Sequence, residues 1–94
     1  MAVGLLTIHI SISDCRTLKE KRSRIKPILA RLHREFNIAA AEIGLQDHHH
    51  EAEIQCTALS TNCREVQAFL QRIVDFFAEN WPDIEILQYR IECI

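Results

Sequence analysis

The chain has 94 residues, of which 48% are hydrophobic and 26% are charged. This length suits one hydrophobic core, and the composition excludes the low hydrophobicity and high charge of disordered chains. The net charge of −2 is unevenly divided, because residues 14–35 carry +5 and the rest of the chain carries −7. No apolar run approaches the ~20 residues that cross a bilayer, and the N-terminal residues lack the basic start of a secretory signal. We therefore expect one domain, residues 1–94, in the cytoplasm.

A change of hydrophobic period marks the first strand and the first helix. Apolar and polar residues alternate from Leu6 to Ile12, which predicts a strand over residues 2–13 with one buried face. The Thr-Leu-Lys-Glu segment at residues 17–20 has the form of a capping box, and the apolar stripe after it predicts a helix that ends near residue 36. Pro27 removes one backbone hydrogen bond from this helix, so we expect a kink or a division into two pieces.

Four further elements follow in the order strand, strand, helix, strand. A polar hairpin loop at residues 46–50 separates the two strands, and Asn62 is the expected cap of the second helix. In the last strand the alternation changes phase near Leu87, which predicts a bulge. The predicted ranges are residues 38–44, 52–58, 63–79 and 84–93.

The resulting βαββαβ order predicts an α+β domain of the ferredoxin-like type. Right-handed crossovers give an antiparallel sheet in the order 4-1-3-2, with both helices on one face. In this topology the turn before the first helix, the 46–50 loop and the turn after the second helix lie at one end of the sheet. Residues that are distant in the sequence are therefore expected to meet there.

The four cysteines show neither a CxxC pair nor a regular spacing, so we expect free thiols. Cys63 and Cys93 lie at the same end of the predicted sheet, and a disulfide between them would contradict this expectation. Cys15 stands beside Arg16 near a helix start. It is either a reactive thiol of lowered pKa or an exposed turn cysteine without a function. Cys56 is expected to face the core.

Two segments carry a resemblance that spans nearly the whole chain: TLKEKR at residues 17–22 and Gly-Leu-Gln-Asp at residues 44–47. The chain resembles the YlxP-like family of uncharacterised bacterial proteins, domain of unknown function 503. The resemblance implies a ferredoxin-like fold, a bacterial cytosolic setting and a gene commonly placed among translation and ribosome-maturation genes. It implies no activity, substrate or catalytic residue. Many members of the family have a histidine where this chain has Leu45.

The first helix is the most basic part of the chain. Helical spacing places Lys19, Arg22 and Lys26 on one flank of the apolar stripe, and Arg24 and Arg31 on the other. Several cations on one surface suit nucleic-acid phosphates, although an ordinary solvated helix face is the alternative. The predicted sheet displays no aromatic residue for base stacking, so RNA would lie along the helix. The residues expected to contact phosphates are Arg16, Lys19, Arg22, Lys26 and Arg34.

Other candidate groups lie near the start of this helix. Gln46 and Asp47 are expected to orient the joint between the turn and the helix. Lys21 points toward the apolar side, where its stem can pack while its amine reaches water. The loop also contains His48, His49 and His50. Adjacent histidines seldom share one ion, so we expect a polar loop and, at most, an opportunistic zinc or nickel site.

No Gly-rich phosphate loop, nucleophile motif or paired-carboxylate motif is present, so no catalytic residue and no cofactor is predicted. We expect a non-enzymatic bacterial accessory protein that binds RNA or a ribosome-associated partner through the first helix and the 46–50 loop. One alternative is a protein interaction or homodimerisation module that uses the outer sheet face or the edge of the second strand. Another is a small enzyme that uses the end of the sheet near Arg16, Asp47 and His48.

Overall fold

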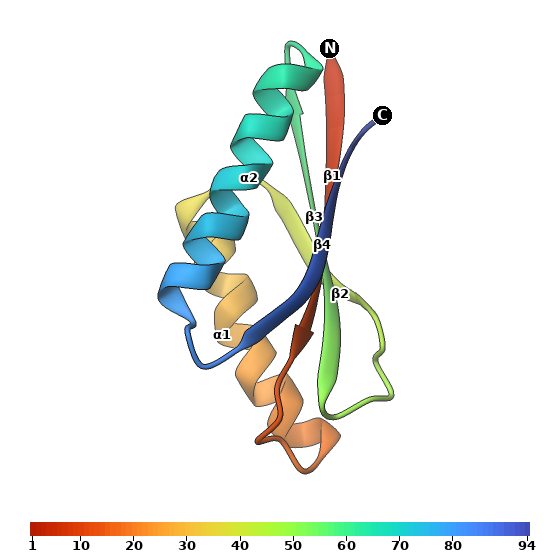
Figure 1. The fold of residues 1–94 in the computed structure, drawn as a ribbon, viewed down its shortest axis with the longest axis vertical. Coiled ribbons are helices and arrows are strands. Elements are labelled where there is room, and N and C mark those ends of the chain that lie inside the picture. Colours follow the sequence, from red (N-terminus) through yellow and green to blue (C-terminus); the bar gives the residue numbers. More distant parts are fainter.

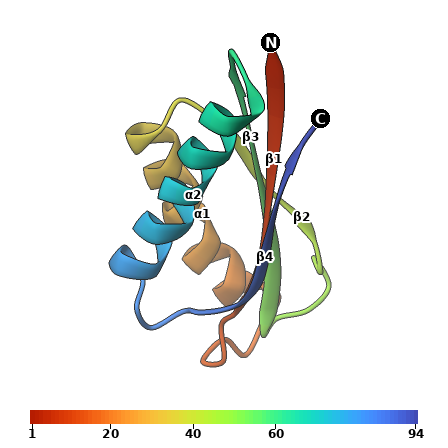
Figure 2. The ribbon, with the colours of Figure 1, turned by 45° about the horizontal axis from the view of Figure 1, so that its top comes forward.

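In the computed structural model, which describes residues 1–94, two helices cover one face of a four-stranded sheet (Figure 1). The elements are β1 (Ala2–Ser11), α1 (Leu18–Glu35), β2 (Ala39–Gly44), β3 (Glu51–Ser60), α2 (Cys63–Asn80) and β4 (Glu85–Cys93). The strand order is β2-β3-β1-β4, and all neighbours are antiparallel. Both helices lie on the same side of the sheet (Figure 2). The predicted ferredoxin-like α+β fold is therefore confirmed.

The core lies between the sheet and the helices, because one face of each central strand and one stripe of each helix are apolar. Burying each large aliphatic or aromatic side chain contributes roughly 1.5–3 kcal/mol, so these positions supply most of the driving force. Neither α1 nor α2 combines the length and the apolar character that a membrane crossing requires. The core residues with no exposed surface include Leu6, Ile8, Ile10, Leu32, Ile54, Cys56, Val66, Leu70, Ile73 and Phe77.

α1 begins at the predicted cap and continues through its proline. Thr17 accepts a hydrogen bond from the Glu20 N–H at 3.1 Å, and the Glu20 carboxylate accepts one from the Arg16 N–H at 3.2 Å. The helix is not split at Pro27, because that residue is exposed and the buried turns on either side of it hold the helix against the sheet. The loss of one hydrogen bond is evidently less costly than the loss of this packing.

The predicted bulge in β4 is confirmed at Leu87. His9 of β1 pairs with Gln88, and the next residue, Ile10, pairs with Ile86, so Leu87 has no partner in the ladder. The extra residue lets two sets of alternating apolar residues, on either side of the bulge, face the same core.

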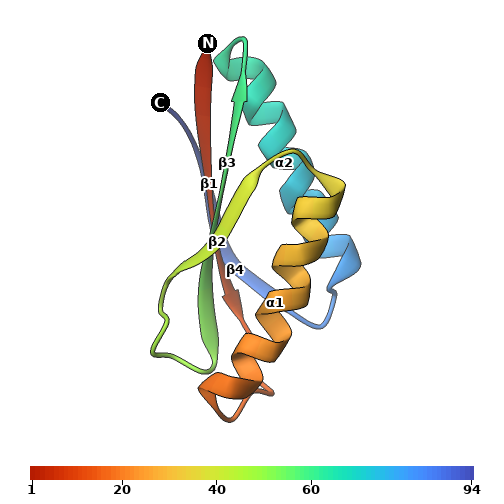
Figure 3. The same ribbon diagram turned by 180° about the vertical axis from the view of Figure 1, so that it is seen from behind.

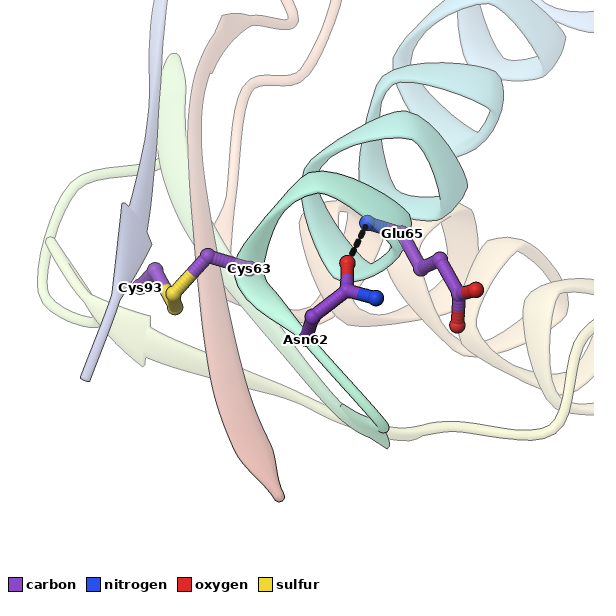
Figure 4. Close-up of a disulfide and its surroundings, with 4 residues drawn as sticks. All are labelled: Asn62, Cys63, Glu65 and Cys93. Atoms are coloured by element: carbon purple, nitrogen blue, oxygen red, sulfur yellow. Dashed lines mark hydrogen bonds between the residues drawn. A yellow bond between two sulfur atoms is a disulfide. The ribbon is translucent and has the colours of Figure 1, made fainter.

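Cys63 and Cys93 form a disulfide, with their Cα atoms 5.8 Å apart, and the prediction that these two thiols are free is wrong (Figure 4). Cys63 is the first residue of α2, and Cys93 lies opposite Gly4 on β1. A Cβ atom at Gly4 would lie 2.7 Å from Val66 and 2.8 Å from Leu70 of α2. The missing side chain at Gly4 lets the start of α2 approach the sheet closely enough for the two sulfurs to bond.

Reduction of this disulfide is expected to lower the stability of the protein markedly. The bond spans a sequence separation of 30 residues, and the loop-closure entropy that it removes from the unfolded chain corresponds to about 3–4 kcal/mol. For a domain of this size we expect a fall in melting temperature of at least about 10 °C on addition of dithiothreitol, measured by circular dichroism.

The double variant Cys63→Ser/Cys93→Ser is the matched control. It should melt near the temperature of the reduced wild type and should show no further response to dithiothreitol. An unchanged melting temperature of the wild type on complete reduction, verified by counting four thiols per chain, would contradict a stabilising disulfide.

Candidate functional site

The side-chain amine of Lys21 is buried at the centre of a cage of oxygen atoms. Lys21 is only 1% exposed, although it belongs to the basic helix α1. Its Nζ donates hydrogen bonds to the carbonyl oxygens of Leu45 at 2.8 Å, His48 at 2.6 Å and Glu51 at 2.9 Å. The carboxylate of Glu42 lies 2.8 Å from the same Nζ. The amine is therefore bound on all sides. The prediction from the sequence that it reaches water is wrong.

An ammonium group has three hydrogens and here faces four acceptors. The three carbonyls use the hydrogens, so Glu42 Oε2 is buried next to the positive charge without a hydrogen bond of its own. Its negative charge is balanced by Lys21, while its capacity to accept a hydrogen bond is unused. The ion pair with the Lys21 ammonium thus takes the place of a hydrogen bond at this oxygen.

The connection between β2 and β3 is shaped around this amine. The segment from Leu45 to Glu51 directs three carbonyls inward, and the view from behind shows it at the same end of the molecule as the first turns of α1 (Figure 3). Leu45 adopts a left-handed conformation with φ of 60°, which costs a non-glycine residue about 1–2 kcal/mol. The Gln46 side chain also donates to the Glu42 carbonyl at 3.2 Å and closes the turn.

A polar pocket of about 280 Å³ opens beside the Lys21–Glu42 pair. We call it the α1–β2 pocket, and it is lined by Leu18, Lys21, Arg22, Glu42, Gln46 and Asp47. It is formed where residues 17–22 meet residues 44–47, the two segments on which the family resemblance rests. Of the residues selected from the sequence, the structure brings Arg22, Gln46 and Asp47 together here.

The other selected cations lie outside the pocket and form, with Arg22, a basic surface around α1. All five are exposed, and none of their side chains forms an ion pair within the chain. On the opposite flank, Arg24 pairs with Asp14 at 2.6 Å and with Asp83 at 2.8 Å, so it is not available to a ligand. The basic surface consists of Arg16, Lys19, Arg22, Lys26 and Arg34.

Arg31 is also tied to the protein itself. Its guanidinium donates to Asn80 at 2.8 Å and stacks over Phe76 and Trp81, 5.2 and 5.7 Å from their ring centres. These contacts join α1 to the end of α2. The two flanks of α1 thus differ: one side is used for packing between elements, and the other side keeps its cations free.

Two of the three histidines of the loop contribute through their backbone carbonyls. The carbonyl of His48 accepts from Lys21, and that of His50 accepts from the Ile12 N–H at 2.6 Å. The rings of His49 and His50 lie 4.0 Å apart. No group of three or more His, Cys, Asp or Glu side chains is arranged so that it could hold a metal ion.

Cys15 is neither a reactive thiol nor an exposed one. It is 2% exposed and belongs to the core. Burial, followed by the nearby negative charge of Asp14, raises the pKa of its thiol. Burial alone raises the pKa of the Cys56 thiol to about 12. Both free cysteines therefore serve as small apolar residues.

The sheet offers a second surface, on the face away from the helices. A shallow apolar groove of about 230 Å³ runs over β2 and its neighbours and includes Leu5, Ala39 and Ile43. The edge of β2 is partly blocked, because the Ala40 N–H donates to His33 at 3.2 Å and the Glu42 carbonyl accepts from Gln46. Strand pairing through this edge is thus disfavoured, while the outer face remains open.

These features define a ferredoxin-like α+β protein in which a basic helix and the β2–β3 connection are joined around one buried lysine. Residues 3–91 match the family described as "Protein of unknown function (DUF503)", and the chain belongs to this family. The resemblance seen in residues 17–22 and 44–47 is thereby confirmed. The chain is 34% identical over 83 residues to "Uncharacterized protein YlxP" of Bacillus subtilis (strain 168), an alignment that covers 88% of this chain and 89% of that protein.

The Lys21–Glu42 pair was not predicted from the sequence, although a partial signal was present. Lys21 precedes Ile25 by four residues and Ile28 by seven, so all three share one helical stripe. Glu42 alternates with Ala40 on the helix-facing side of β2. A basic residue in an apolar stripe and an acidic residue on an inward strand position together indicate a buried ion pair, but only once the two elements are known to touch.

Replacement of Lys21 by methionine is expected to lower the free energy of unfolding by about 3–5 kcal/mol. The variant leaves the Glu42 charge buried without a counter-ion and three carbonyls without a donor. Urea unfolding followed by circular dichroism measures the loss. Lys26→Met, an exposed position on the same helix, is the matched control and should change stability by less than about 0.5 kcal/mol. Equal stability of the two variants would show that the Lys21 cage is not structurally important.

Changing His48, His49 and His50 together to alanine is expected to cost less than about 0.5 kcal/mol. The contacts that hold this loop use backbone carbonyls, which alanine retains. The same urea titration measures the change. A loss above about 1 kcal/mol would mean that the imidazole rings themselves stabilise the loop.

Proposed function

We propose that this protein is a non-enzymatic RNA-binding protein that contacts phosphate groups through the basic surface of α1. The observation that carries the proposal is the state of the five cations on this surface: all are exposed, and none is neutralised by an acidic neighbour. A phosphate backbone binds such a surface because each contact releases condensed counterions. A ribosome-associated partner that presents RNA would be recognised in the same way.

The charge distribution supports contact on one side only. Residues outside 14–35 carry a net charge of −7, so the other surfaces repel a polyanion. The outer face of the sheet carries Gln55 and Thr57 beside the buried Thr7 along its centre and has no aromatic platform for bases. The single tyrosine, Tyr89, lies opposite the inward-facing Ile8 and donates to Gln71 of α2. Binding is therefore expected along α1, with phosphates as the main contacts.

A binding role is also favoured over catalysis by the state of the reactive groups. The Lys21 amine is buried and held by three carbonyls and a carboxylate, so a substrate does not reach it. The two free thiols are buried, and their pKa values are raised. The buried amine and the two buried thiols thus serve the fold.

Reversing Arg22 and Lys26 to glutamate is expected to weaken RNA binding by at least about tenfold. The loss of two contacts to a single strand should also reduce the slope of log K against log salt by about 1.4. Fluorescence anisotropy with a labelled oligonucleotide, repeated at several salt concentrations, measures both quantities. The stability of the variant should be close to that of the wild type, since both side chains are exposed.

The matched control is Arg64→Glu/Arg72→Glu on α2, which changes the net charge by the same amount at two other exposed arginines. It should leave the salt slope unchanged. If the wild type shows no salt-sensitive affinity tighter than about 10⁻⁴ M, the RNA proposal is abandoned. Self-association through the outer face of the sheet, measured by analytical ultracentrifugation, would then be the leading alternative.

A further inference from the structure

The α1–β2 pocket contains hydrogen-bonding groups that the protein does not satisfy. Glu42 Oε2 is not one of them, because it is buried 2.8 Å from the Lys21 amine and a ligand does not reach it. The side chains of Arg22 and Asp47 have no partner within the chain, and the Gln46 amide uses one of its two N–H groups on the Glu42 carbonyl. The pocket thus presents the exposed Asp47 carboxylate as an acceptor and the Arg22 guanidinium as a donor.

The charges around the pocket restrict what it can bind. Lys21 and Arg22 contribute two positive charges, and Glu42 and Asp47 contribute two negative ones. A metal ion or the cationic side chain of another protein would meet the Lys21 amine, 2.8 Å from the Glu42 oxygen, and the Arg22 guanidinium. A phosphate inside the pocket would be repelled by the two carboxylates. A neutral group with both donors and an acceptor fits this environment best.

We propose that the α1–β2 pocket binds a guanine base of single-stranded RNA; this inference rests on the proposed function. Guanine is neutral, and its Watson–Crick edge presents N1–H and N2–H₂ side by side, which together match the two oxygens of a carboxylate. The O6 atom beside them accepts a hydrogen bond from an arginine. Adenine, cytosine and uracil lack this pair of adjacent donors.

The position and the size of the pocket agree with this assignment. Arg22 belongs both to the pocket and to the basic surface, so a base in the pocket is continuous with phosphates held along α1. The volume of about 280 Å³ lies just under the roughly 300–1,000 Å³ of pockets for drug-sized ligands, which suits a single base. Proteins read single-stranded RNA in this way, by binding unstacked bases along their Watson–Crick edges.

The test compares three fluorescein-labelled RNA hexamers that differ at one central position. The first is all uridine, the second has one guanosine and the third has one inosine, which keeps N1–H and O6 but lacks the 2-amino group. At fixed salt the wild type should bind the guanosine probe at least about fivefold more tightly than the other two, because inosine leaves one carboxylate oxygen unpaired.

The variant Asp47→Asn tests whether this preference originates in the pocket. Asp47 is exposed, so the variant should fold, and it should lose the guanosine preference while keeping the salt slope of the wild type. Asp75→Asn, an exposed aspartate on α2, is the control and should retain the preference. If Asp47→Asn keeps the preference for the guanosine probe, the assignment of the base to this pocket is overturned.

The outcomes for the two proposals are distinguishable. Equal, salt-dependent affinity for all three hexamers would overturn the guanine inference and leave phosphate binding by α1 intact. The absence of salt-dependent affinity for any hexamer would overturn both. Tighter binding of the inosine probe than of the guanosine probe would also reject the inference, since the 2-amino group would then be unfavourable in the pocket.

Discussion

The arrangement of α1, β2 and the β2–β3 connection depends on one buried ammonium group. The Lys21 amine of α1 holds two carbonyls of the connection, the carbonyl of Glu51 at the start of β3 and the Glu42 carboxylate of β2, so it fixes these elements relative to one another. A buried ion pair adds little net stability when compared with apolar residues of the same shape, because both charges lose their hydration. The Lys21–Glu42 pair instead favours one arrangement of the chain, because few other arrangements would offer the amine four oxygens. This matters for β2, which has a strand neighbour on one side only.

The same short segment builds both the anchor and the candidate binding surface. Lys21 and Arg22 are adjacent in the sequence and differ by about 100° around the helix, so Lys21 is buried in its cage of oxygens at the base of the pocket while Arg22 is exposed beside it. The geometry of the pocket is therefore coupled to the stability of the fold. The left-handed backbone at Leu45 also links the pocket to the fold, because the Leu45 carbonyl is one of the three that accept hydrogen bonds from the Lys21 amine. Strain of this kind persists where the surrounding structure determines the conformation.

Local patterns in the sequence predicted the parts of the structure that depend on local physics. The alternation in β1, the Thr17 cap and the bulge at Leu87 involve a few neighbouring residues each, and all three are observed. The Cys63–Cys93 disulfide and the Lys21–Glu42 pair depend on how closely two elements approach each other. Residue patterns do not give the distance between two elements, so neither contact was predicted. The burial of Cys15 was missed for the same reason, because a turn residue is covered or exposed according to what packs over it. For the candidate site, the predicted topology correctly brought Arg22, Gln46 and Asp47 together. The backbone carbonyls that shape the pocket could not be predicted, because every residue has a carbonyl and residue types do not show where it points.

The burial of Lys21 also divides the lysines of this protein into two chemical classes. The chain has three, at positions 19, 21 and 26, and only the first and the last are exposed. A reagent or an enzyme that acylates amines can reach those two, while the third is shielded as long as the protein is folded. Complete acylation of the native protein would thus remove two positive charges from α1 and leave the internal one in place. The charge that α1 presents to solvent can be altered covalently without disturbing the charge that holds it to the rest of the fold.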